Sequence, residues 1–324
     1  MPKLIIQIPC FNEQDTLPVT LAALPRSIPG VDRVDVLIIN DGSTDDTAAV
    51  AREHGVEHIL DIKVNRGLAH GFMAGLRQAL LLGADYVVNL DADNQYNADD
   101  IPKLLEPLMQ GRADMAVGER PIRDMEHFSA TKKSLQTLGS WIVRKLSGTS
   151  VKDTPSGFRA MNRNALLNLF IFNEYTYTHE SLIAAREAGL RVIGVPIRVN
   201  TGQLRPSRLM RSTFEYVVRS AGTVLRFYFL YNSGRFFLSI AVVFLVPGIL
   251  LIGRFFYFFF TGQGDGWVQS LVIASVLIGV GVLCLIMAVV GDMLKVNRKL
   301  MQKTLSELRE HMALHHDHES GNDS

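Results

Sequence analysis

Two aspartates separated by one residue, Asp91 and Asp93, follow an apolar run that reads Tyr-Val-Val-Asn-Leu. Such a run predicts a short buried strand, and carboxylates at the end of a strand can turn toward one divalent cation. Hard oxygen ligands suit Mg²⁺ or Mn²⁺, which keep waters and phosphate oxygens as their other ligands. Gln95 can add a neutral oxygen. The pattern predicts a metal and phosphate site, whereas a solvated acidic turn is the common alternative for an isolated Asp-X-Asp.

Three more polar clusters follow predicted strands, at residues 9–13 (PCFNE), 41–45 (DGSTD) and 65–67 (NRG). The glycines in these turns allow the backbone to approach a ligand closely. Asp41 can accept hydrogen bonds from a base, and Phe11 can pack beside it. Each cluster alone is commonly a turn or a helix cap. Their succession at strand ends indicates one binding edge.

Apolar runs and amphipathic segments alternate along the first part of the chain. Strands are expected at Lys3–Pro9, Val34–Asn40, His58–Ile62, Tyr86–Leu90 and Met115–Gly118, and helices at Glu13–Leu24, Thr44–His54, Leu68–Leu82 and Ala98–Gln110. This alternation predicts an α/β fold with a mostly parallel sheet covered on both faces. Ligands bind such sheets beyond the carboxyl ends of the strands, which is where the polar clusters fall.

The following part of the chain is less regular. It contains expected helices at Met125–Leu146 and Glu180–Ala188, a turn-rich segment at Asp153–Arg159, and a late strand at Val192–Val199. Arg208–Tyr231 reads as a basic and aromatic amphipathic helix. Such a helix suits the interface of an anionic membrane, and an ordinary surface helix is the alternative.

Two nearly uncharged runs, Phe236–Phe260 and Trp267–Val290, are each long enough to cross a hydrocarbon core of about 30 Å. Arg and Lys residues flank the pair, and the loop that joins the runs carries one acidic residue. The positive-inside rule then places both termini and the N-terminal domain in the cytoplasm of an integral membrane protein. The expected domains are residues 1–205 (catalytic), 206–235 (interfacial helices), 236–291 (two transmembrane helices) and 292–324 (cytoplasmic tail).

Composition excludes few classes of protein. The formal net charge of +1 over 324 residues, without a basic and aromatic module, gives no indication of nucleic-acid binding. The two cysteines, Cys10 and Cys284, fall in a predicted strand and a predicted span, so we expect no disulfide. The short apolar run at the N-terminus does not read as a signal peptide.

In order and spacing, PCFNE, INDGSTDDT, NRG and LDADNQY resemble the motifs of family-two glycosyltransferases with the glycosyltransferase A fold. GER (118–120), DTPSGFRA (153–160) and TYTHE (176–180), followed by two spans, resemble the branch of dolichol-phosphate mannose synthases and bacterial polyprenyl-phosphate glycosyltransferases. The resemblance covers Lys3 to Arg235, and the spans match in kind only. It implies inverting, metal-dependent transfer of a hexose from a GDP- or UDP-hexose to a dolichyl or undecaprenyl phosphate in the membrane.

The residues and the resemblance together give a set of expected site residues. Nucleotide-sugar binding is expected of Pro9, Phe11, Asn12, Glu13, Asp41, Gly67, Asp91 and Ala92; metal binding of Asp91, Asp93 and Gln95; acceptor-phosphate binding of Arg120, Lys132, Lys133 and Arg208; and catalytic roles of Asp93, Asp153 and Glu180. A phosphate monoester is already largely anionic at neutral pH, so cations are needed more than a strong base. Asp153 as a turn residue and Glu180 as a first-turn helix carboxylate remain alternatives.

The motifs depart from the family pattern in three places. Glu119 interrupts a segment where Gly-Ser-Arg is usual, and only Lys132 and Lys133 stand where a second arginine is usual further along the chain. Arg208 stands where a Ser-Lys-Leu or Ser-Arg segment is usual. These departures weaken the acceptor assignments more than the donor assignments.

Other classes of protein fit less well. A processive polysaccharide synthase usually carries Gln-X-X-Arg-Trp, and neither Trp141 nor Trp267 follows an arginine. The intact acidic motif argues against a non-catalytic membrane sensor of nucleotide sugars. A Rossmann-type oxidoreductase would need a Gly-X-Gly-X-X-Gly turn after the first strand. The sequence does not identify the sugar, the base or the lipid length. It does not identify the oligomeric state either, and it is compatible with a homo-oligomer.

Overall fold

The computed structural model describes residues 2–121, 140, 143–144, 147–171, 177–200, 213–262 and 268–322. For residues 213–231 and 314–322 it describes the backbone alone. The chain forms two compact units. The first comprises Met1–Ser220 and Gln302–Ser324, and the second comprises Ala221–Met301. The site residues described below belong to the first unit.

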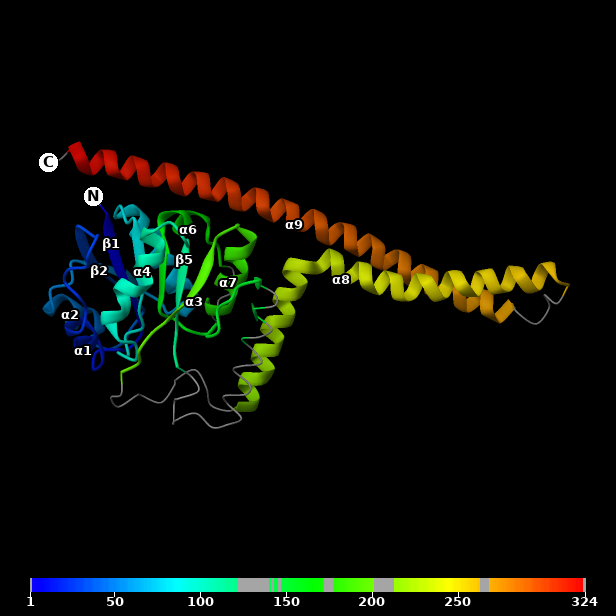
Figure 1. Cartoon of the computed structure of the whole chain (residues 1–324), viewed down its shortest axis with the longest axis horizontal. Coiled ribbons are helices and arrows are strands. Elements are labelled where there is room, and N and C mark those ends of the chain that lie inside the picture. Colours follow the sequence, from blue (N-terminus) through cyan, green and yellow to red (C-terminus); the bar gives the residue numbers. More distant parts are fainter. Residues whose placement is uncertain are drawn as a thin grey trace. The chain divides into compact units, whose positions relative to one another are not determined.

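A seven-stranded sheet is the centre of the first unit, with the strand order β3-β2-β1-β4-β6-β5-β7 (Figure 1). The strands are β1 (Lys3–Cys10), β2 (Arg33–Asp41), β3 (His58–Ile62), β4 (Tyr86–Asn89), β5 (Met115–Glu119), β6 (Arg159–Asn162) and β7 (Val192–Pro196). Only β6 pairs antiparallel, with β4 and with β5. The expected mostly parallel α/β fold is confirmed. The expected strands lie within a few residues of their observed bounds, but β6 falls where only a turn-rich segment ending at Arg159 was expected.

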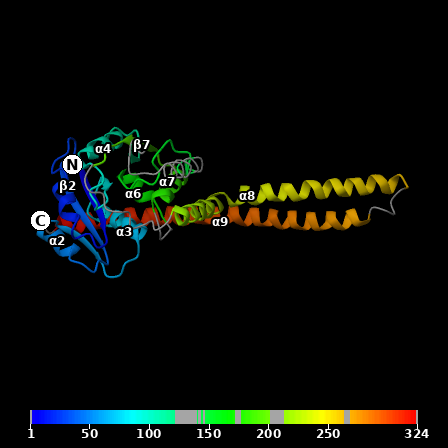
Figure 2. The same cartoon turned by 90° about the horizontal axis from the view of Figure 1, so that it is seen from below.

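The helices of this unit are α1 (Leu17–Ala22), α2 (Thr47–Glu53), α3 (Leu68–Leu81), α4 (Ile101–Met109, preceded by a 3₁₀ turn at Ala98–Asp100), α6 (Arg163–Asn168) and α7 (Thr178–Glu187) (Figure 2). Helices expected from Glu13 and Thr44 begin three or four residues later. The residues before them form loops that hydrogen-bond to one another instead. The expected helix at Met125–Leu146 falls almost entirely outside the described residues.

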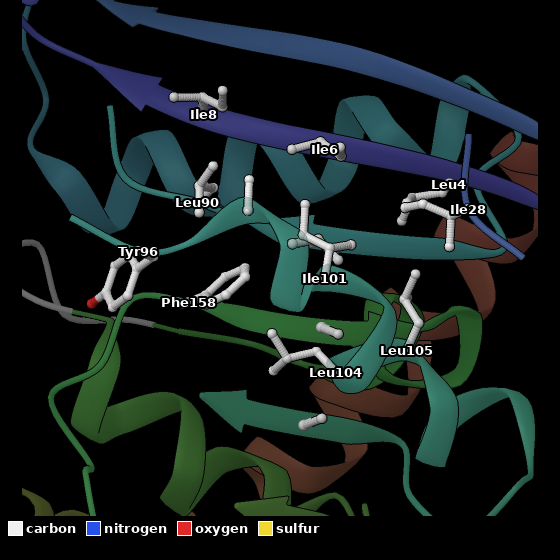
Figure 3. Packing of buried hydrophobic residues seen from close by; sticks show 14 of the residues in the cluster. Leu4, Ile6, Ile8, Ile28, Leu90, Tyr96, Ile101, Leu104, Leu105 and Phe158 are labelled. Carbon is white, nitrogen blue, oxygen red and sulfur yellow. The ribbon is translucent and has the colours of Figure 1, made fainter. Parts of the chain in front are cut away.

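Alternation along β1 explains how the sheet is covered. Leu4, Ile6 and Ile8 belong to a buried cluster that includes α4 residues such as Leu104, and Figure 3 shows these side chains between strand and helix. On the other face a glycine of α3, Gly75, lies so close to the sheet that an added Cβ would approach Gln7 Oε1 to 2.5 Å. Because successive side chains of a strand point to opposite faces, one strand serves both layers.

The second unit, Ala221–Met301, consists of most of helix α8 (Thr213–Phe260) and the first part of helix α9 (Val268–Asn322). Within this unit the two helices lie side by side in both views (Figures 1 and 2). Segments Asn232–Phe260 and Val268–Ala313 are long and apolar enough to cross a membrane, judged by length and composition. Glycines allow the two helices to approach, since a Cβ on Gly281 would lie 2.5 Å from Leu245 Cγ. Small residues have the same use where helices pack in lipid. Cys10 and Cys284 are both free, as expected.

Candidate active site

The loop that follows β4 presents the two aspartates of the central motif. Asp93 is exposed and Asp91 is partly buried. Asp93 Oδ1 accepts a hydrogen bond from the backbone N–H of Gln95 at 3.0 Å. Burial and the neighbouring charge of Asp93 raise the pKa of Asp91 to about 7, against the opposing effect of Arg120 and Arg159. A carboxyl group in this state gains from a nearby cation, because the cation stabilises the ionised form.

Asp91 lies directly against the backbone of Gly157. A Cβ on Gly157 would approach the two carboxylate oxygens of Asp91 to 2.7 and 2.8 Å. Gly157 is itself fixed, since its N–H donates to Tyr96 Oη at 3.0 Å and its carbonyl accepts from Asn89 Nδ2 at 2.9 Å. Only glycine permits this approach, so the Gly of DTPSGFR provides the space in which Asp91 sits.

A series of hydrogen-bonded, buried polar side chains holds Gly157 in place. Gln7 Nε2 donates to Asn89 Oδ1 at 2.8 Å, and Asn89 Nδ2 also donates to Tyr177 Oη at 2.9 Å. The ring of Tyr177 stacks on Phe72 with centroids 3.9 Å apart. Sequence reasoning missed Asn89 and Tyr177. The available signal was the pair of amides, Gln7 and Asn89, inside runs that are otherwise apolar.

The residues present fit a hard cation in the kind of atoms that they offer. Within the described part of the chain, no group of three or more His, Cys, Asp or Glu converges as a metal cluster. Two carboxylates and an amide are nevertheless the oxygen ligands that Mg²⁺ accepts when phosphate oxygens and waters complete its shell. The cradle at Gly157, which holds one of these carboxylates in place, supports such a site.

The loops after β1 and β2 are joined to each other by side chain to backbone hydrogen bonds. Asn12, in a left-handed conformation with φ 55°, accepts from Thr44 N at 2.8 Å and donates its own N–H to Ser43 Oγ at 3.0 Å. Glu13 N donates to Thr47 Oγ1 at 2.9 Å. The predicted nucleotide residues Asn12 and Glu13 therefore form a fixed rim with the next loop.

Asp41 organises the third loop. Its two carboxylate oxygens accept from the backbone N–H groups of Arg66 at 3.0 Å and Gly67 at 2.8 Å. Gly42 allows the loops after β2 and β3 to approach each other, because a Cβ at this position would lie 2.5 Å from Asn65 N. A carboxylate oxygen can accept more than one hydrogen bond, so contact with a base remains compatible with this arrangement.

Arg120 and Asp153 form a buried ion pair beside the metal motif. Arg120 Nε and Nη2 donate to the two Asp153 oxygens at 2.6 and 3.0 Å. The remaining terminal nitrogen, Nη1, lies 3.5 Å from Gln95 Oε1. The structure thus brings an expected acceptor residue, an expected catalytic residue and an expected metal ligand together. The two residues of the pair are 33 positions apart in the sequence.

Arg159 is fully buried behind this pair. It donates to the carbonyls of Thr154, Ser156 and Thr178 at 2.7 to 2.9 Å, and it contacts the Ser181 hydroxyl. One guanidinium therefore joins the segment that contains Asp153 to the first turn of α7, which contains the buried Glu180. Burial and the charge of Arg159 lower the pKa of His179, in the same turn, to about 4.

The expected site residues thus fall into three groups. Those of the nucleotide loops and of the metal motif follow the neighbouring strands β3, β2, β1 and β4, with Gly67 in the loop after β3 and Pro9 inside β1. The Ala92 carbonyl accepts from Thr20 Oγ1 at 2.9 Å. The second group lies further along the chain: Arg120 follows β5, Asp153 precedes β6, and Glu180 belongs to α7. Lys132, Lys133 and Arg208 lie outside the described residues.

The model of the glycosyl transferase family 2 matches residues 5–170. An undecaprenyl-phosphate mannosyltransferase of Micrococcus luteus is 29% identical over 217 residues, which are 64% of this chain and 87% of that protein. An uncharacterised glycosyltransferase of Mycobacterium tuberculosis is 32% identical over 194 residues, 59% of this chain and 83% of its own. A polyprenol monophosphomannose synthase of Mycolicibacterium smegmatis is 26% identical, with 65% and 82% covered.

Solved structures share the fold. The glucosyl-3-phosphoglycerate synthase of Mycobacterium tuberculosis, in complex with Mn²⁺, UDP and glucosyl-3-phosphoglycerate, superimposes with a TM-score of 0.51. The match covers 69% of this chain and 80% of that chain at 18% identity. At this identity the likeness concerns the architecture alone.

Proposed function

We propose, from the premise that the chain belongs to glycosyl transferase family 2 and is a glycosyltransferase, that it moves a hexose from a nucleoside-diphosphate sugar to a polyprenyl phosphate. The observation that carries this proposal is the meeting of Asp91, Gln95 and the Arg120–Asp153 pair beside Gly157. That arrangement offers oxygen ligands and a fixed cation at one edge of the sheet. The names of two relatives, a mannosyltransferase and a mannose synthase specific for polyprenyl-type phosphates, support the acceptor.

On the donor side, Asp91, Asp93 and Gln95 would hold Mg²⁺ or Mn²⁺ together with the diphosphate. The cation supplies positive charge that stabilises the departing nucleoside diphosphate. The rim formed by Phe11, Asn12 and Glu13, with Asp41 and Gly67, would bind the nucleoside. Because loops after three strands are tied to one another, this rim is preorganised, which lowers the entropic cost of binding.

On the acceptor side, Arg120 would bind the phosphate. Asp153 accepts from Nε and Nη2 of Arg120, and Nη1 points to Gln95 Oε1, one of the proposed metal ligands. In this proposal Asp153 orients the guanidinium, and no strong base is required because the phosphate is already anionic. Lys132, Lys133 and Arg208 would add charge. Glu180 would bind the sugar or act on it, with inversion at the anomeric carbon.

The two apolar helices would anchor the enzyme in the membrane. Lys295, Arg298 and Lys299 follow the second apolar run, and Arg235 precedes the first. The positive-inside rule then favours a cytoplasmic catalytic domain with both termini on the same side. A membrane-embedded lipid phosphate would meet the site from that side.

A panel assay tests the proposal. Purified protein is incubated with GDP- and UDP-hexoses and with undecaprenyl or dolichyl phosphate, with and without Mn²⁺, and the lipid products are separated. We expect one lipid-linked monosaccharide that requires the metal. A polymer product would indicate a processive synthase instead, and binding without turnover would indicate a sensor.

Two variants test the residue roles within this assay. Asp93→Ala is expected to abolish turnover, whereas Asp99→Ala, an exposed acidic residue six positions away, serves as the matched control. Arg120→Ala is expected to raise KM for the lipid acceptor more than KM for the donor. An equal rise of both KM values would reject the acceptor role of Arg120.

A further inference from the structure

Asn200 binds three successive residues of the loop that carries the metal motif. Its side-chain Nδ2 donates to Asn94 O at 2.9 Å, to Asn94 Oδ1 at 3.2 Å and to Tyr96 O at 3.2 Å. Its backbone N–H donates to Gln95 O at 2.9 Å. Asn200 therefore donates to all three backbone carbonyls of residues 94–96, although it lies more than 100 positions away in the sequence.

The segment that presents Asn200 is itself firmly held. Asn97 N donates to Arg198 O at 3.3 Å, and Tyr96 and Val199 form an isolated antiparallel bridge. Arg198 binds the fully buried carboxylate of Asp100 through its backbone N–H at 2.6 Å and through its guanidinium. Through Arg198 the segment that carries Asn200 is thus anchored to Asn97 and Asp100, which lie outside residues 94–96.

The loop needs such support. Asn94 has φ 52°, in the left-handed region that costs energy for a residue other than glycine. Gln95 is held on both sides, because its N–H donates to Asp93 Oδ1 and its carbonyl accepts from Asn200. Its side chain faces Arg120 Nη1 at 3.5 Å. A shift of the Gln95 backbone would therefore move both the Asp93 carboxylate and the Gln95 side chain that faces Arg120.

We propose that Asn200 is a positioning residue for the donor site. It holds residues 94–96 in the shape that aims Asp93 and Gln95 at the cation and the diphosphate, without touching either ligand. This inference rests on the proposed function, because it assigns Asn200 to the same donor site. It adds a residue that neither the motifs nor the comparisons indicate.

The test compares Asn200→Ala with Asn162→Ala. Asn162 makes similar bonds, donating to Asp114 Oδ1 at 3.1 Å and accepting from Ala165 N at 2.9 Å, but it lies at the opposite end of β4 and β6 from the metal motif. Mn²⁺ and nucleoside-diphosphate binding are measured by calorimetry without acceptor, and KM values are measured for both substrates. Thermal unfolding of each variant reports the loss of stability.

For Asn200→Ala we expect Mn²⁺ and nucleotide binding to weaken roughly tenfold, the factor that corresponds to the loss of a hydrogen bond or two. Donor KM should rise similarly while acceptor KM stays unchanged. Because the variant binds Mn²⁺ more weakly, kcat should fall at low Mn²⁺ and return to the wild-type value in excess Mn²⁺. Asn200→Ser, which keeps a short donor, should give intermediate values, and it replaces the alanine variant if the latter does not fold. Asn162→Ala should lower the unfolding temperature without changing Mn²⁺ affinity.

Three results would overturn the inference. If the wild type binds Mn²⁺ and nucleotide and Asn200→Ala binds them equally well, the proposed function stands and the role of Asn200 falls. If Asn162→Ala weakens binding as much, the effect of Asn200 is general destabilisation. If the wild type binds neither Mn²⁺ nor any nucleoside diphosphate, the proposed function and the inference fall together.

Discussion

The two halves of the catalytic sheet hold their functional residues by different means. After β1, β2 and β3, backbone N–H groups donate to neutral side chains, as between Thr44 and Asn12, and to the carboxylates of Asp41 and Asp45, without an arginine side chain in these contacts. From β4 to β7, arginines carry the corresponding contacts, with carboxylate partners in three cases and carbonyl partners around Arg159. The proposed donor rim is thus held by many single hydrogen bonds from backbone N–H groups, whereas the proposed acceptor side depends on a few buried arginines.

The difference has an energetic consequence. A neutral hydrogen bond contributes about 1 kcal/mol net, so losing one leaves most of the donor rim intact. Removing one member of a buried ionic group costs about 3–5 kcal/mol because the remaining group is left without compensation. The proposed phosphate site needs a fixed cation, and Arg120, held by Asp153, would provide it. We expect mutations to separate the two halves by this measure.

The largest effect should come from Arg159→Met. The substitution keeps much of the side-chain volume but leaves the carbonyls of Thr154, Ser156 and Thr178 without their donor. We expect the free energy of unfolding to fall by about 3 kcal/mol or more. Denaturant titration in detergent measures the change. A loss below about 1 kcal/mol would make Arg159 equivalent to a residue of the donor rim and would remove the contrast.

The second prediction concerns acid, through Asp114 on the arginine-rich side. Burial would raise the pKa of Asp114, but hydrogen bonds from Arg191, Asn162 and Asn164 lower it to about 2. Because the folded pKa lies below the unfolded value of about 3.9, this stabilisation is complete above about pH 4 and is lost as the pH falls through 2.

Its full size is roughly 2 kcal/mol. Asp114→Asn should therefore be less stable at neutral pH and should show a shallower fall in stability between pH 5 and pH 2. Unfolding measured across that range gives both slopes. Equal slopes for the wild type and the variant would show that the Arg191 contact does not hold in solution.

The contrast between the halves also explains what the sequence could predict. The donor clusters could be found because they follow apolar runs directly, and parallel strands bring their carboxyl ends to one edge. The pairing of Arg120 with Asp153 could not be found, since no periodicity connects residues in separate irregular segments. The same holds for Asn200.

β6 was missed for a related reason. Its four residues, Arg-Ala-Met-Asn, begin with a charge and give no apolar alternation, yet all but Asn162 are buried because the strand lies between β4 and β5. The buried Arg159 finds two carbonyl acceptors in the preceding turn, at Thr154 and Ser156, and the third at Thr178 of α7, a contact that the local sequence does not reveal. The roles of Lys132, Lys133 and Arg208 stay predictions.

The third prediction addresses Gly157, where the two halves meet. In Gly157→Ala the new methyl group would press on the Asp91 carboxylate and on Tyr177 Oη. We expect a stability loss of about 1–3 kcal/mol, typical of overpacking, together with a loss of Mn²⁺ binding. Gly281→Ala is the control, since its methyl group would press on Leu245 in the second unit, which contains no residue of the metal motif. Both variants should lose stability, but only Gly157→Ala should lose metal affinity beyond what its stability explains.

The smallest effect on stability should come from the donor rim, in Asn12→Ala. The substitution removes the acceptor of Thr44 N and places alanine at φ 55°, a conformation that asparagine tolerates better. We expect a loss of about 1 kcal/mol, because Glu13, Gln14 and Ser43 still join the two loops. Nucleotide binding should nevertheless weaken several-fold, since the loops lose part of their preorganisation. Asn12→Gly keeps the backbone conformation without the side chain, so it separates the two causes. If Asn12→Gly binds nucleotide as well as the wild type does, the rim depends on backbone shape alone and the hydrogen bond to Thr44 has no part in it.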